Sequence, residues 1–83
     1  MVIEKKRATA DEIKAELKRR IEASTARDGG CRGCEAPMPE AARPRKDGDP
    51  NWIVVALPRL ADGCFGPILQ IVDQARLEYE LVP

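Results

Sequence analysis

The chain has 83 residues, no histidine, and 14 basic and 14 acidic side chains that cancel to a formal net charge of zero. This length suits one small domain and excludes two. A neutral chain with no basic run longer than Lys5-Lys6-Arg7 has no overall attraction for nucleic acid. The N-terminus lacks the apolar segment of a signal peptide, and no apolar run approaches the roughly 18 residues of a membrane span. We therefore expect a single domain over residues 1–83, in the cytoplasm, with no membrane or nucleic-acid partner.

The first predicted element is a helix over residues 10–27. Thr9-Ala10-Asp11-Glu12 has the pattern of a capping box, in which the Thr9 and Glu12 side chains each pair with the other residue's backbone amide. Glu16 and Arg20 are spaced for an ion pair on the helix surface. The large apolar residues fall on one narrow row, which predicts packing against a single surface: Ile13, Leu17 and Ile21.

The middle of the chain favours loop structure. Asp28-Gly29-Gly30 offers a glycine for the left-handed position that ends a helix. Residues 35–39 can form an edge strand only, because two prolines exclude the segment from a sheet interior. Residues 40–50 hold no large apolar side chain, and we expect them to form a flexible loop.

The strongest strand signal is Trp52-Ile53-Val54-Val55-Ala56-Leu57, which is apolar at every position and is followed by Pro58. A strand without alternation needs cover on both faces. Trp52 is expected in the core, and the second face of the strand is expected to bind a second copy or another protein.

A second helix is predicted over residues 67–80. Pro67 suits the first helical position, where its missing amide hydrogen costs nothing. Apolar residues recur at steps of three and four from Ile68 to Val82. The alternation at the C-terminal end leaves a strand over residues 77–82 as an alternative to the end of this helix.

The one motif with chemical content is Cys31-Arg32-Gly33-Cys34, which a third cysteine, Cys64, follows 30 residues later. Two thiolates in one turn can bind a single metal ion. A zinc site built from Cys31, Cys34 and Cys64 still needs a fourth ligand, which Asp62, water or a second chain could supply. Zinc is therefore a possible cofactor on sequence grounds, although the missing fourth ligand speaks against it.

Two other interpretations of the cysteines remain open. The Cys31/Cys34 pair could carry out thiol redox chemistry, but it follows a helix C-terminus instead of opening a helix, as a thioredoxin-like motif does. Alternatively, all three thiols are reduced and simply pack, which we favour. An odd number of cysteines without an export signal argues against a disulfide framework.

Together these patterns predict a small α+β fold in the order α-β-β-α, with an N-terminal helix, a minimal antiparallel hairpin and a C-terminal helix. A two-stranded hairpin is rarely stable alone. We therefore interpret the chain as a protein-interaction or regulatory module, binding a protein partner or forming a homodimer, with no catalytic residues and no required cofactor. The metal-binding and thiol redox functions are the alternatives.

Overall fold

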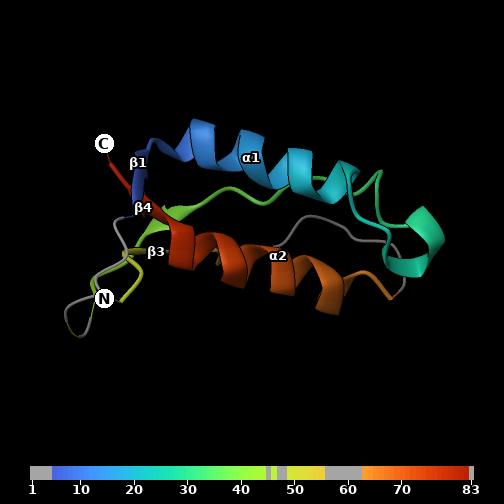
Figure 1. Ribbon diagram of the computed structural model, residues 1–83. Coiled ribbons are helices and arrows are strands. Elements are labelled where there is room, and N and C mark those ends of the chain that lie inside the picture. The colour runs from blue at the N-terminus through green and yellow to red at the C-terminus, as the bar shows by residue number, and fades with distance from the viewer. Residues whose placement is uncertain (1–4, 45, 47–48, 56–62, 83) are drawn as a thin grey trace.

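The computed structural model describes residues 5–44, 46, 49–55 and 63–82. Its elements follow in the order β1 (Lys6–Ala8), α1 (Ala10–Glu22), a 3-10 helix η1 (Ala26–Gly29), β2 (Glu40–Ala41), β3 (Trp52–Ile53), α2 (Phe65–Glu78) and β4 (Tyr79–Leu81). The two helices run antiparallel beside each other, with the strands gathered at one end (Figure 1). The predicted α+β class, with a helix at each end and an antiparallel hairpin between them, is confirmed.

Helix α1 begins where the sequence predicts. The Glu12 amide donates to the Thr9 hydroxyl at 3.3 Å, and the Thr9 amide donates to the Glu12 carboxylate at 3.1 Å, so the capping box is present. The helix ends at Glu22, five residues before the predicted end at Arg27. Just beyond this end of α1, the Arg32 side chain donates a hydrogen bond to the Ser24 carbonyl at 2.9 Å. A side chain from the following turn therefore supplies a partner for this carbonyl.

The last two residues of η1 have left-handed backbone conformations. Asp28 and Gly29 both have positive φ, 55° and 84°. Glycine adopts this conformation without strain, whereas aspartate is one of the few other residues that tolerate it. The predicted glycine signal is therefore used, but it ends the 3-10 helix and not α1.

Helix α2 begins at Phe65, two residues before the predicted start, and ends at Glu78. Pro67 is thus the third helical residue, where the amide hydrogen it lacks would have no partner within the helix. The Ile68 amide makes the first helical bond, to the Cys64 carbonyl at 3.0 Å. At the other end, Tyr79–Leu81 leave the helix and form β4, so the predicted helical end at Glu80 is wrong and the strand alternative holds for these residues.

The strands form two separate pairs. β1 and β4 are parallel, with Arg7 opposite Glu80, and β2 and β3 are antiparallel, with Ala41 opposite Trp52. The parallel pair was not predicted, because β1 is a three-residue polar segment that shows no alternation and becomes a strand only by pairing with β4. Such pairing depends on residues more than 70 positions away in the chain.

The hairpin strands differ from their predicted bounds. β2 is Glu40–Ala41 and not residues 35–39, and it lies inside the predicted flexible loop over residues 40–50, of which residues 45, 47 and 48 lie outside the described residues. Of the predicted strand over residues 52–57, Trp52–Ile53 form β3 and residues 54–55 are described but not paired, whereas residues 56 and 57 lie outside the described residues.

Side chains at the start of β3 join the two strand pairs. The Asn51 amide nitrogen donates to the Leu81 carbonyl at 2.9 Å, and the Leu81 amide donates to the Asn51 Oδ1 at 2.8 Å. Trp52 Nε1 donates to the Tyr79 carbonyl at 3.0 Å. The Asn51 side chain thus pairs with β4 as a neighbouring strand's backbone would.

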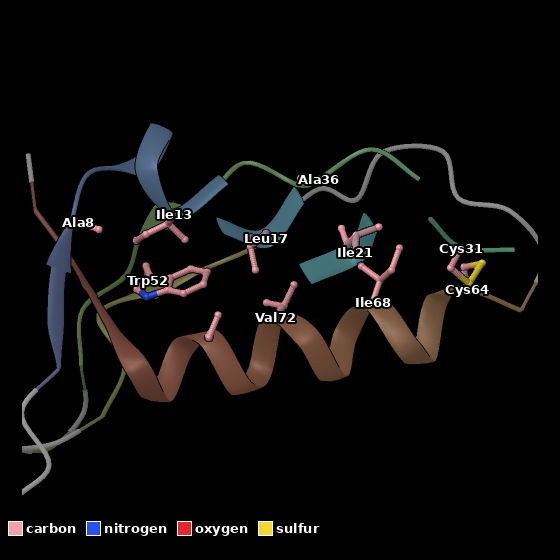
Figure 2. Close-up of a cluster of buried hydrophobic side chains, with 11 residues drawn as sticks. Ala8, Ile13, Leu17, Ile21, Cys31, Ala36, Trp52, Cys64, Ile68 and Val72 are labelled. Carbon is pink, nitrogen blue, oxygen red and sulfur yellow. A yellow bond between two sulfur atoms is a disulfide. The ribbon is translucent and has the colours of Figure 1, made fainter. Parts of the chain in front are cut away.

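The core lies between the helices and continues to Trp52 (Figure 2). The row predicted for α1 is fully buried, and Trp52 is buried as expected. The disulfide is at the opposite end of this core from Trp52 (Figure 2). The buried residues of the cluster are Ala8, Ile13, Leu17, Ile21, Cys31, Ala36, Trp52, Cys64, Ile68, Val72 and Ala75.

We expect Asn51→Ala to lower the free energy of unfolding by about 1–3 kcal/mol, because it leaves a backbone donor and acceptor of β4 without partners. Urea denaturation measures this difference. Gln70→Ala, at an exposed position of α2, serves as the control and should change stability by no more than about 0.5 kcal/mol. Equal stability of Asn51→Ala and wild type would show that this junction does not stabilise the fold.

Candidate functional site

The cysteines are the first candidate site, and the structure divides them into a pair and a single thiol. Cys31 and Cys64 form a disulfide with a Cα–Cα distance of 5.6 Å, and each is 1% exposed. Cys31 follows η1, and Cys64 is the N-cap residue of α2. The cross-link therefore joins the turn after the 3-10 helix to the beginning of the second helix (Figure 2).

This disulfide corrects the expectation that all three thiols are reduced. Sequence spacing directed attention to Cys31 and Cys34, which share a motif, whereas the fold joins two cysteines 33 positions apart. No local pattern signals such a pair, because it forms only when the antiparallel helices bring the end of η1 beside the start of α2. Cys64 was expected to pack, and it is buried in the core cluster.

Cys34 is the free cysteine of the motif, and it is half-buried. Its amide donates to the Cys31 carbonyl at 3.1 Å, so residues 31–34 form a hydrogen-bonded turn. Cys34 packs against the core cluster and lines a cavity of about 420 Å³. Lys14 and Lys18 of α1 and Arg32 line the same cavity, together with two glutamates.

The predicted zinc ligands are thus neighbours, but two of them are bonded to each other. Sulfurs in a disulfide are not thiolates, so coordination by Cys31, Cys34 and Cys64 would require the reduced protein. Within the described part of the chain, no group of three or more His, Cys, Asp or Glu side chains could hold a metal ion. Asp62, the fourth ligand considered from the sequence, lies outside the described residues.

A network of charged groups connects the two helices. Arg20 donates to both carboxylate oxygens of Glu78, at 2.8 and 3.2 Å, and to Glu16 at 3.2 Å. The Arg20 guanidinium also lies 5.8 Å from the centre of the Tyr79 ring. The Glu16/Arg20 pair was predicted from spacing, whereas Glu78 could be added only by the packing of α2 on α1.

These contacts change the acidity of the carboxyl groups. Hydrogen bonds from Arg19, with a further contribution from Arg20, lower the pKa of Glu16 to about 2. The hydrogen bonds from Arg20 lower the pKa of Glu78 below its ordinary value. Both glutamates are therefore held in the charged state that the arginines stabilise, which indicates a structural role.

Another candidate site is a groove of about 670 Å³. It lies where the beginning of α1, the segment around β2 and the end of β4 meet. Apolar side chains form most of its wall. Asn51 also lines it, and the Asn51 side-chain amide is hydrogen-bonded to β4. The lining residues are Thr9, Ala10, Asp11, Met38, Pro39, Ala41, Asn51, Leu81 and Val82.

Several exposed apolar side chains lie on the hairpin or beside it. Along β3 and the residues after it, Trp52 is buried, Ile53 is 36% exposed, Val54 is half-buried and Val55 is 66% exposed. One face of this segment is thus directed to the core, whereas the described residues leave Ile53 and Val55 on the other face exposed. Of the large apolar residues that are exposed in the described regions, three belong to the hairpin and its flanks: Met38, Ile53 and Val55.

Comparison with known proteins gives no independent guide to this surface. No protein family, no curated protein and no solved structure matches the chain. In the described part of the chain, none of the helices has the length and apolar character needed to cross a membrane.

We expect Cys64→Ala to lower the free energy of unfolding by about 2–5 kcal/mol, because the cross-link that restricts the unfolded chain is lost. Cys34→Ala is the matched control and should cost about 1 kcal/mol. Urea denaturation with and without a reductant measures both. If reduction leaves the wild-type midpoint unchanged, the disulfide does not contribute to stability.

The ionic network predicts acid sensitivity with a defined sign. Because the pKa of Glu16 is lower in the folded protein than its ordinary value of 4.5, its contribution is complete above about pH 4.5 and is lost as the pH falls toward 2. Glu16→Gln should therefore flatten the dependence of unfolding free energy on pH in that range. The exposed Glu22→Gln, used as the control, should keep the wild-type slope, and identical slopes for both variants would contradict this assignment.

Proposed function

We propose that this protein is a small non-catalytic interaction module that binds a second copy of itself through the exposed face of the hairpin. The observation that carries this proposal is the gathering of Met38, Ile53 and Val55 on the hairpin and its flanks, where each remains exposed to solvent. Exposed apolar side chains that cluster are typical of interaction surfaces, whereas scattered ones are ordinary.

The marginal size of the strand pairs supports the same conclusion. β2 and β3 have two residues each, and two-stranded hairpins are at best marginally stable without further cover. The inner face of β3 gains that cover from the core through Trp52. A partner on the outer face would bury Ile53 and Val55 and complete the cover that an apolar strand requires.

A second copy fits this face by charge and by symmetry. The formal net charge is zero, so two copies experience no overall repulsion as they approach. A two-fold arrangement places the same apolar face on both sides of the interface, which matches apolar side chains with apolar side chains. The adjoining groove, lined by Met38 and Pro39, extends the surface available for contact.

The absence of catalytic residues remains part of this proposal. Among the described residues, no polar or charged side chain is buried, so none has the desolvated environment that commonly tunes acids, bases and nucleophiles. A cytoplasmic location also remains a prediction. It is in tension with the disulfide, a bond typical of oxidising compartments.

Sedimentation velocity at micromolar concentrations tests the proposal. We expect the wild type to sediment as a dimer and Val55→Glu to sediment as a monomer, because a carboxylate within the apolar face must be desolvated on association. Phe65→Glu is the matched control. Phe65 is 58% exposed, but it begins α2 at the end opposite the strands (Figure 1).

Phe65→Glu should keep the dimeric state of the wild type. A wild-type protein that remains a folded monomer throughout the concentration series would contradict self-association. Dissociation by both variants to the same extent would place the contact elsewhere than on the hairpin.

A further inference from the structure

The Cys31-x-x-Cys34 motif is not used by the proposed interaction surface, yet it places a free thiol beside a disulfide. Cys34 is half-buried, whereas both sulfur-bearing residues of the Cys31–Cys64 bond are buried. All three cysteines belong to, or pack against, the same core cluster. The arrangement therefore contains both reactants of a thiol–disulfide exchange within one chain.

The turn geometry favours Cys31 as the sulfur that Cys34 attacks. The Cys34 amide donates to the Cys31 carbonyl at 3.1 Å, which fixes the two residues at the ends of one turn. Gly33, between them, has no heavy atom within 4 Å of the position that a β-carbon would occupy, so this side of the turn is not enclosed by other parts of the described chain. Disulfides between cysteines at this spacing are the basis of known exchange motifs.

The position of Cys64 favours its release as the leaving group. Cys64 is the N-cap of α2, a helix of 14 residues, and its side chain makes no capping hydrogen bond. The first amides of a helix stabilise negative charge at this position. The backbone amides at the start of α2 would therefore stabilise a departing Cys64 thiolate. The thiolate could accept a hydrogen bond from these amides, which the sulfur of the disulfide does not do.

We propose that Cys34 is an internal exchange thiol that converts the Cys31–Cys64 disulfide into a Cys31–Cys34 disulfide. The deprotonated Cys34 sulfur attacks the Cys31 sulfur, the Cys31–Cys34 bond forms, and the Cys31–Cys64 bond breaks. Cys64 leaves as a thiolate. It then accepts a proton from solvent, which balances the proton that Cys34 lost when it was deprotonated. The number of disulfides is unchanged, so the step needs no external oxidant or reductant.

The exchange replaces a long-range cross-link by a local one. In the first isomer, the bond joins residues 33 positions apart and holds the start of α2 beside the turn after η1. In the second isomer, the bond lies within one turn and places no restraint on α2. The start of α2 is thereby released while the protein stays oxidised.

Alkylation of the native oxidised protein, followed by tryptic mapping, tests this step. Arg32 separates the two cysteines of the motif, so trypsin gives three distinct peptides: residues 28–32 with Cys31, residues 33–45 with Cys34 and residues 60–76 with Cys64. Iodoacetamide is added to the folded protein, and the remaining thiols are then blocked in acid before digestion to prevent further exchange.

We expect the acetamide label to appear on Cys34 and also on Cys64, with the peptide of residues 28–32 then disulfide-linked to that of residues 33–45. The Cys64 label should appear at a rate that is independent of protein concentration, because the step is intramolecular. Cys34→Ser, which retains the original disulfide but no free thiol, should lose the Cys64 label completely.

If the acetamide label is found on Cys34 alone after alkylation has gone to completion, the proposal is overturned. A Cys64 label that persists in Cys34→Ser, or one whose rate rises with protein concentration, would also overturn it, because both would show that the sulfur of Cys34 is not the internal nucleophile. Each result is independent of self-association through the hairpin, since Val55→Glu should show the same labelling pattern as the wild type.

Discussion

The fold depends on the junction that Asn51 and Trp52 make with β4. Among the described residues, the four strands have only two or three residues each, and neither pair extends into a larger sheet by backbone hydrogen bonds. Asn51 pairs with both backbone groups of Leu81, and Trp52 donates to Tyr79. Arg76 of α2 donates to the Trp52 carbonyl at 2.8 Å, so the same residue also connects the hairpin with the second helix. These side chains join elements that are too short to be stable separately.

The two helices are held together by different means along their length. Burial of one row of α1 against α2 supplies the apolar contact, and Arg20 adds the connection from α1 to Glu78. The disulfide closes the end of the molecule opposite Trp52 (Figure 2). This distribution suits a chain of 83 residues, because a domain of such size buries too little apolar surface to depend on its core alone.

The two proposed functions use separate parts of this arrangement. The proposed interaction surface lies at the strand end, where Ile53 of β3 and Val55 just after it are exposed. The exchange thiol lies near the other end, where the Cys31–Cys64 bond holds the start of α2. Isomerisation of the disulfide would change the restraint on α2, and α2 leads directly into β4. The second helix is therefore the element through which the cysteines could influence the strand end.

Local chemistry in the sequence determined the helices. The Thr9/Glu12 capping box fixed the start of α1, and the apolar row fixed its buried face, because both depend on residues within a few positions of one another. The burial of Trp52 and the α+β class were likewise predictable from the apolar content of the second half of the chain. The ends of the helices were predicted less well, since Arg32 and β1 act on them from outside the helix.

Only the tertiary structure decided which distant residues pair. Ala8 becomes part of a strand because Leu81 is brought beside it, and Cys31 bonds Cys64 because the antiparallel helices place η1 next to the start of α2. The C-x-x-C spacing groups Cys31 with Cys34, whereas the fold bonds Cys31 to Cys64. A motif records which residues are close in sequence, whereas a disulfide or a parallel strand pair requires long-range closure of the chain, which no local pattern encodes.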